Sequence, residues 1–226
     1  MIRCCFLATL GLLFSASALN AQASNFTPAP IASEPVKQET MEDPQVGDHW
    51  TYELRDDITG DIKSTYTSTV TDVSATEITM RDAIDSNPNF GYANYDRFWN
   101  RTSNDSWHFA PNDGAGIRSP LAVGKTWSVK ANDSNTSAGV GWKRSVTSKV
   151  VVQESVTTRA GTFDTFKIEI TFDLQNTKYP TKKVQDIRQM WYAPAIDHWV
   201  KQTSVMRWDG RVRTRTSTEL IEYGRL

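Results

Sequence analysis

Apolar and polar residues alternate along most of the chain after Val46. The clearest run covers residues 166–174, in which every second side chain is apolar: Phe166, Ile168, Ile170, Phe172 and Leu174. A period of two places such residues on one face of a β-strand and the intervening polar residues on the other. Residues 62–71 alternate similarly and are rich in the β-branched and aromatic types that strands favour. The pattern predicts an all-β domain.

Turn signals and a repeated hexapeptide divide this β-rich region. Asp209-Gly210 is a typical two-residue hairpin turn. Val46-Gly47-Asp48-His49-Trp50-Thr51 is echoed by Val123-Gly124-Lys125-Thr126-Trp127-Ser128, and each copy precedes strands rich in aromatic residues. We therefore expect two antiparallel meanders, a half over residues 46–120 and a second half over residues 121–226. Packed into one compact domain, they predict a sandwich or a half-barrel.

The first 45 residues differ from the rest. Residues 1–23 combine an early positive charge, a short apolar run and an Ala21-Gln22-Ala23 exit, which is typical of a cleavable secretory signal. The apolar run is shorter than a transmembrane helix requires, although an uncleaved anchor is the alternative. Residues 24–45 contain four prolines and few large apolar residues, so we expect a disordered tether.

The composition limits the kinds of reactive and metal-binding site that the mature chain can contain. The two cysteines of the sequence, Cys4 and Cys5, lie inside the predicted signal, so disulfides, thiolate nucleophiles and cysteine-bound metals are excluded after cleavage. We expect a periplasmic or secreted bacterial protein with no transmembrane segment in the mature chain. Residues 24–120 carry seven Lys and Arg against sixteen Asp and Glu, and residues 121–226 carry seventeen against ten. This asymmetry indicates either a partner-binding face or two halves with complementary fields, and export with near-neutral charge argues against nucleic acid.

Three short segments resemble a known group of sequences. They are Val46-Gly47-Asp48-His49-Trp50, residues 160–167 (AGTFDTFK), and Trp191-Tyr192-Ala193-Pro194 followed by Trp199-Val200-Lys201. They resemble uncharacterised bacterial secreted β-rich proteins, some of them labelled TapB-like, over about residues 46–205. The resemblance implies an extracytoplasmic antiparallel β fold and carries over no catalytic residue.

Catalytic and metal-binding motifs have little support in the sequence. Each of the three histidines adjoins a tryptophan: His49, His108 and His198. With the tryptophans inward, strand alternation would turn these histidines toward solvent, and no local zinc spacing joins them. The nucleophile and zincin motifs of known hydrolases are missing. We predict no catalytic residue, no metal and no cofactor.

Eight tryptophans supply the candidate binding residues. Trp50, Trp127 and Trp191 are expected in the core, and Trp142 and Trp208 on the surface. The Asp209-Gly210 turn predicts a register in which Ser204, Met206 and Trp208 share a face with three arginines. The predicted ligand-binding residues are therefore Trp142, Trp208, Arg211, Arg213 and Arg215. The arginines suit a phosphate or an acidic glycan, or they form a solvated strand face.

Three functions remain open at this point. The first is a non-enzymatic extracytoplasmic β-domain that binds an apolar or glycan ligand or an envelope protein. The second is a cell-envelope hydrolase that uses two carboxylates, as glycosidases do. The third is a structural protein of a larger assembly, and the charge asymmetry between the two halves is the observation that suggests it. A concave aromatic cavity would favour the ligand-binding domain. Two carboxylates facing each other in a cleft would favour the hydrolase, and a flat apolar patch would favour the assembly protein.

Overall fold

The computed structural model describes residues 40–85, 87 and 89–225. The predicted signal peptide, 1–23, and most of the predicted tether, 24–45, lie outside the described residues. Within the remainder of the tether segment, Met41 is fully buried and its backbone N–H donates to the carbonyl of Ala195 at 2.8 Å. In the part of the chain that is described, no helix has the length and apolar character needed to cross a membrane.

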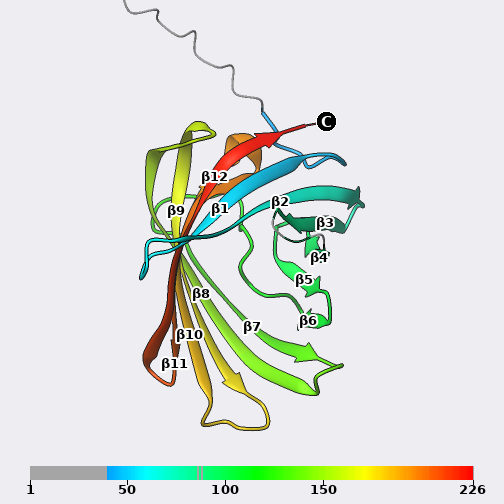
Figure 1. Cartoon of the computed structure of the whole chain (residues 1–226), viewed down its shortest axis with the longest axis vertical. Helices are drawn as coiled ribbons and strands as arrows, with labels where there is room; N and C mark the ends of the chain where they lie inside the picture. Colours follow the sequence, from blue (N-terminus) through cyan, green and yellow to red (C-terminus); the bar gives the residue numbers. More distant parts are fainter. Residues whose placement is uncertain (1–39, 86, 88, 226) are drawn as a thin grey trace, which may run out of the picture. The chain divides into compact units, whose positions relative to one another are not determined.

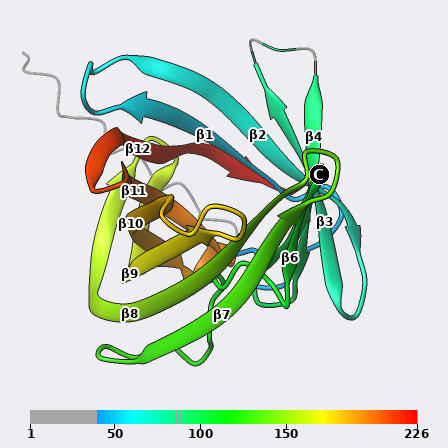
Figure 2. The same cartoon turned by 90° about the horizontal axis from the view of Figure 1, so that it is seen from below.

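Twelve antiparallel strands and one short 3₁₀ helix form the domain, in the order β1 (His49–Asp56), β2 (Ile62–Val73), β3 (Glu77–Ile84), β4 (Phe90–Asp96), β5 (Arg101–Asn104), β6 (Trp107–Ala110), β7 (Thr126–Asn135), β8 (Val140–Thr158), β9 (Gly161–Asn176), β10 (Lys183–Ala193), η1 (Pro194–Ile196), β11 (His198–Trp208) and β12 (Arg211–Gly224). Each strand pairs with its neighbours in sequence, and β12 pairs with β1 (Figures 1 and 2). The all-β prediction is confirmed.

The predicted sandwich or half-barrel is wrong, because the sheet closes into a barrel. Two ladders join the predicted halves. Strand β12 runs along β1 from His49↔Gly224 to Asp56↔Thr216, and β6 runs along β7 from Trp107↔Asn135 to Ala110↔Asn132. A meander that curls until its first and last strands meet satisfies the backbone groups that a sandwich would leave at its edges.

The core is arranged as the alternation predicts. Ile168, Ile170 and Phe172 of β9 are buried, and they belong to one of two apolar clusters inside the domain. Trp50 is completely buried in the other cluster, and Trp127 and Trp191 are each exposed by less than a tenth. The assignment of these three tryptophans to the core is therefore confirmed.

The two copies of the hexapeptide adopt the same backbone pattern. Gly47 and Gly124 both have positive φ, 96° and 89°, a region that glycine enters without steric cost. Gly47 N–H donates to the carbonyl of Val70 at 2.9 Å, and Gly124 N–H donates to that of Val150 at 2.8 Å. In both copies this turn starts a strand whose tryptophan points inward.

The loop between β6 and β7 passes through the interior of the barrel. Ile117 of this loop packs in the same cluster as Trp127 and Val146. Gly116 lies so close to the β4–β5 turn that an added Cβ would come within 2.3 Å of the carbonyl oxygen of Phe98. Interior space that side chains of the strands would otherwise fill is therefore occupied by backbone.

Candidate functional site

A cavity of about 270 Å³ lies inside the barrel between the strands and the β6–β7 loop. Its wall combines aromatic rings, three arginines and two aspartates. The lining residues are Tyr52, Tyr66, Ser68, Met80, Asp82, Tyr95, Trp99, Arg101, Phe109, Asp113, Ala115, Ile117, Arg144, Arg188, Met190, Tyr192, His198, Trp199 and Gln202. Concave sites with few converging polar groups are the usual form of small-molecule sites.

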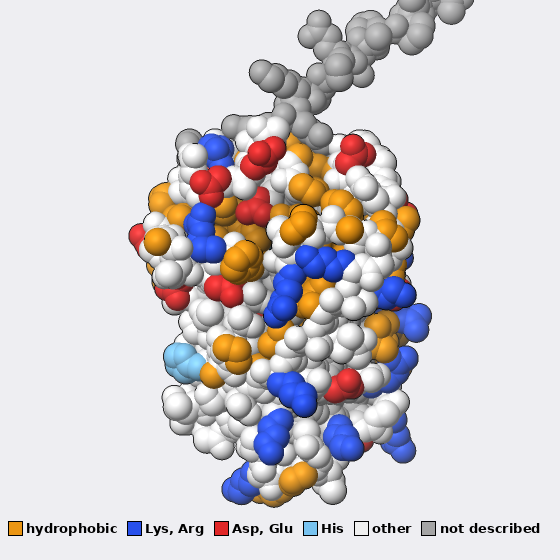
Figure 3. Space-filling view, turned by 180° about the vertical axis from the view of Figure 1, so that it is seen from behind, with side chains coloured by type: hydrophobic (Ala, Val, Ile, Leu, Met, Phe, Trp, Pro, Cys, Tyr) orange, Lys and Arg blue, Asp and Glu red, His pale blue; other side chains and the backbone are white. Residues whose placement is uncertain are grey.

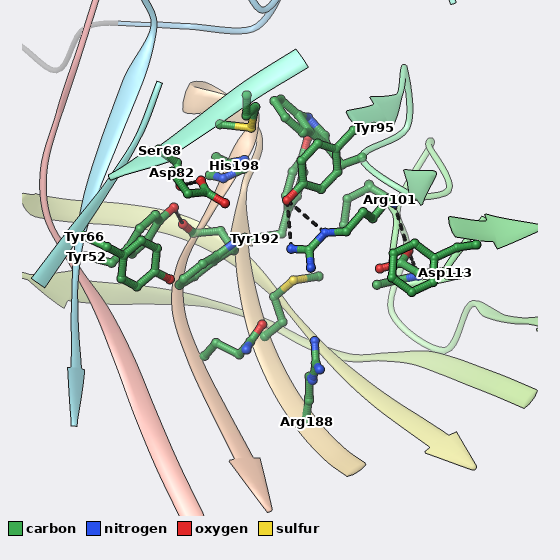
Figure 4. Close-up of a pocket in the computed structure, with 18 of the residues that line it drawn as sticks. Tyr52, Tyr66, Ser68, Asp82, Tyr95, Arg101, Asp113, Arg188, Tyr192 and His198 are labelled. Atoms are coloured by element: carbon green, nitrogen blue, oxygen red, sulfur yellow. Dashed lines mark hydrogen bonds between the residues drawn. The ribbon is translucent and has the colours of Figure 1, made fainter. Parts of the chain in front are cut away.

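Strands β2 and β3 supply one polar wall of the cavity. Ser68 and Asp82 lie directly opposite each other in the β2–β3 ladder, so both side chains point inward. Ser68 Oγ donates to Asp82 Oδ1 at 2.5 Å. In Figure 4 this pair lies beside Tyr66 and His198, on the side of the cavity that faces Arg101.

Arg101 enters the cavity from β5. Its Nη2 and Nε donate to the hydroxyl of Tyr95 at 2.9 and 3.3 Å. Among the described residues, no carboxylate lies close enough to form an ion pair with its guanidinium. Tyr95, followed by Asp113, raises the pKa of Arg101, so the guanidinium stays charged. A guanidinium has five N–H donors, and a single phenol hydroxyl leaves several of them available to a molecule in the cavity.

Asp113 holds the β6–β7 loop against β5. Its Oδ1 accepts the backbone N–H groups of Arg101 at 2.9 Å and Ala115 at 3.0 Å. Burial raises the pKa of Asp113, although the nearby guanidinium of Arg101 acts in the opposite direction. The Asn-Asp-Gly sequence at 112–114 is typical of a turn, and no local pattern indicates that this loop lies inside the barrel.

The two other cavity arginines have carboxylate partners. Arg144 Nε donates to both oxygens of Asp133 at 2.9 Å, and Arg188 Nε donates to Asp186 Oδ2 at 2.6 Å. Both aspartates are buried. Arg188 points into the cavity from β10, below Arg101 in Figure 4. Arg101 is therefore the cavity arginine whose charge lacks an ion-pair partner in the part of the chain that is described.

Aromatic rings packed on one another form a further part of the cavity wall. Tyr52 stacks on Trp199 with ring centres 3.9 Å apart, and its hydroxyl donates to the carbonyl of Trp199 at 2.8 Å. The ring of His198 lies 4.3 Å from that of Trp50 and 4.7 Å from that of Trp99. Burial raises the pKa values of Tyr52, Tyr66 and Tyr192, so these phenols remain neutral.

His198 corrects the expectation that the three histidines face solvent. Its side chain is buried, and burial lowers its pKa to about 3. The simple alternation fails because the β10–β11 ladder has a bulge between Trp191 and Tyr192, and because Asp197, directly before the strand, has a positive φ of 44°. The other two histidines lie elsewhere, and no cluster of three metal-ligating side chains occurs among the described residues.

None of the predicted ligand-binding residues lines the cavity. Trp142 is half-buried on β8, opposite Asp133. Trp208 is 46% exposed at the end of β11, and Arg211 lies opposite it as predicted.

The predicted arginine stripe is wrong beyond Arg211. A bulge between Met206 and Arg207 places Arg215 opposite Val205, on the other face from Met206. The bulge adds one residue to β12, and an added residue reverses the faces of all that follow. The assignment of these residues to ligand binding stays a prediction.

Sequence reasoning did not single out Arg101, Tyr95 or Asp82. They are spread over three short strands, and their convergence depends on closure of the barrel. The available signal was weak: polar and charged residues stand at inward positions of otherwise apolar strand faces, such as Arg188 next but one to Met190.

Comparison with known proteins gives a family match over part of the chain. The profile of the DUF3108-like family matches residues 126–206, which correspond to β7 through most of β11. A search of curated protein sequences finds no significant match.

Two solved structures resemble the domain. One is a candidate lipoprotein from Parabacteroides distasonis, with a TM-score of 0.57 and 15% identity, and the other is a candidate exported protein with a YmcC-like fold from Bacteroides fragilis, with a TM-score of 0.52 and 14% identity. Each alignment covers 83% of this chain and the whole of the other.

At such low identity these likenesses show the fold alone. They support the predicted resemblance to bacterial β-rich proteins without assigned function, and none of them carries the TapB-like label. The chain is thus similar to the DUF3108-like family over residues 126–206 and has a fold resembling those of the two bacterial proteins.

Proposed function

We propose that the domain acts outside the cytoplasm and binds, inside its barrel, a small ring-shaped molecule that carries an acidic group. Arg101 carries this proposal, because its charged guanidinium faces the cavity with the Tyr95 hydroxyl as its side-chain hydrogen-bond partner. A carboxylate or phosphate ester would accept the remaining N–H groups in the paired geometry that guanidinium favours. The signal-like residues 1–23 support the location.

The rest of the wall fits such a ligand. Rings of Trp99 and Trp199 line the cavity, and rings of this kind stack on a sugar or an aromatic ring. Asp82 can accept hydrogen bonds from hydroxyl groups, and Gln202 can both accept and donate them. The volume of about 270 Å³ lies just below the usual range of ligand pockets, which favours a small molecule over a long acyl chain.

Binding of acid-bearing rings is testable by calorimetry. Two acids, glucuronate and phenylacetate, are each compared with a neutral counterpart, glucose or phenylacetamide. We expect at least one acid to bind at least tenfold more tightly than its neutral counterpart, and Arg101→Met to abolish that preference. Arg81→Met, a change at an exposed position of β3, is the control and should bind as the unaltered protein does. Equal affinity of both members of each pair, or full binding by Arg101→Met, would refute the proposal.

One observation favours a second function, the carboxylate hydrolase. Asp82 and Asp113 line the same cavity, and burial raises the pKa of Asp113, as general acids require. Against it, Asp113 Oδ1 already accepts two backbone N–H groups. Hydrolysis of a nitrophenyl glycoside that Asp113→Asn abolishes, while binding of the acid probe persists, would favour the hydrolase. No hydrolysis by the unaltered protein would leave the binding function.

A further inference from the structure

One end of the barrel is strongly basic. The β9–β10 loop with the first residue of β10, residues 177–183, and the β11–β12 hairpin, residues 207–213, form a rim that contains six cations and one carboxylate, Asp209. The basic rim consists of these cations and the aromatic residues between them: Lys178, Tyr179, Lys182, Lys183, Arg207, Trp208, Arg211 and Arg213. In Figure 3, Lys and Arg side chains gather toward this lower end, and most Asp and Glu side chains lie nearer the upper end.

Backbone contacts join the two hairpins of the rim. Asp209 N–H donates to the carbonyl of Lys183 at 3.1 Å, and Lys183 N–H donates to Asp209 Oδ1 at 3.1 Å. The two segments therefore form one continuous surface, and the single carboxylate of the rim accepts a hydrogen bond from the backbone.

The cations of the rim have no carboxylate partner among the described residues. The ion pairs found among the described residues involve none of the six. Five of the six side chains are exposed, and Arg207 is half-buried. Six positive charges close to a single carboxylate repel one another, and they attract an anionic surface.

Apolar side chains lie exposed among these cations. Tyr179 is 50% exposed, Trp208 is 46% exposed and Val212 is 45% exposed. Lys182 and Lys178 lie over the ring of Tyr179, with their Nζ atoms 4.8 and 5.5 Å from its centre. Tyrosine and tryptophan beside lysine and arginine are typical of protein surfaces that lie at the headgroup level of a bilayer.

We propose that the basic rim docks on a lipid bilayer surface that carries anionic headgroups. The charges fit a layer of phosphates, and the three exposed apolar side chains would lie between the headgroups. A soluble polyanion would pair with the charges but would leave the apolar side chains in water, so the bilayer accounts for more of the surface. This proposal is independent of the cavity and of any ligand within it.

Vesicle flotation tests the proposal with the full chain, so that the N-terminal residues are identical in every arm. Vesicles of phosphatidylcholine alone are compared with vesicles that also contain phosphatidylglycerol. We expect binding to the anionic vesicles only, and a marked loss of binding in 0.5 M NaCl.

A charge-reversal pair locates the contact. Lys178→Glu/Arg211→Glu alters both hairpins of the rim at exposed positions, and Lys130→Glu/Lys149→Glu makes the same charge change on the outer faces of β7 and β8. A cation near an anionic bilayer contributes about fivefold in affinity, so the rim variant should bind at least about 25-fold more weakly. The control should lose much less. Circular dichroism verifies that both variants are folded.

Several results would overturn the proposal. They are equal binding to both kinds of vesicle, undiminished binding by the rim variant, or an equal loss in the control. Binding to hyaluronate without binding to anionic vesicles would identify the rim as a polyanion site and would likewise overturn it.

Discussion

Arg101 and Tyr95 lie opposite each other in the β4–β5 ladder, and the guanidinium of Arg101 donates twice to the hydroxyl of Tyr95. Tyr95→Phe removes this acceptor and leaves two enclosed donors unsatisfied. We expect a loss of about 1–3 kcal/mol in the free energy of unfolding. Tyr92→Phe is the control, because Tyr92 lies on the same strand but is 48% exposed. Urea denaturation of both variants measures the difference in the free energy of unfolding. Equal values for the two variants would show that the Tyr95 hydroxyl does not stabilise the fold.

The pair of Asp133 and Arg144 allows a test of ion-pair energetics inside the barrel. Asp133 is buried, and its removal in Asp133→Leu leaves an unpaired arginine, so we expect a loss of about 3–5 kcal/mol. Asp133→Leu/Arg144→Met replaces both partners with apolar side chains and should recover most of that stability. Denaturant melts of the single and double variants provide the comparison. A double variant less stable than Asp133→Leu alone would contradict the expectation.

His198 should make the protein less stable in mild acid. Burial lowers its pKa in the folded state to about 3, whereas an exposed histidine titrates near 6.5. Between those values the unfolded state binds a proton that the folded state does not. Stability is therefore lost as pH falls from about 6.5 toward 3, by up to about 1.4 kcal/mol per pH unit. His198→Gln should flatten this part of the pH profile, and exposed His108→Gln should not. The same slope in all three proteins would refute the assignment.

Replacing a buried tryptophan with alanine should destabilise the protein far more than replacing an exposed one. Trp50→Ala and Trp127→Ala empty buried sites and should each cost about 3–5 kcal/mol. Trp208 is 46% exposed at a hairpin, so Trp208→Ala should cost no more than about 1 kcal/mol. Denaturant melts at one pH measure all three. Unfolding caused by Trp208→Ala together with a harmless Trp127→Ala would reverse the assignment.

Local pattern was sufficient to predict the strands and much of the core. Alternation in residues 166–174 placed Ile168 and Phe172 inside correctly, because side-chain direction in a strand follows from the period alone. Closure was not predictable in this way. The pairing of His49 with Gly224 joins residues far apart in sequence, and no local signal states how far a meander curls before its edges meet.

Bulges caused the remaining errors at the candidate sites. Alternation holds only while the ladder is regular, and one added residue turns all later side chains to the other face. This is why Arg215 was placed with Met206, and it contributed to the placement of His198 in solvent. The convergence of Asp82, Arg101 and Arg188 also depends on closure, so the cavity could not be predicted from any one segment.

Because the β6–β7 loop passes through the barrel, the size of the cavity is not set by the strands alone. In a barrel filled by its own strands, the room inside is set by the number and tilt of those strands. Here Asp113, Ala115 and Ile117 of a connecting segment form part of the cavity wall. Substitutions or length changes in that segment can therefore resize or reshape the chamber and leave every rung of the surrounding ladder in place. The strand framework and the choice of molecule that the cavity binds can therefore change independently of each other.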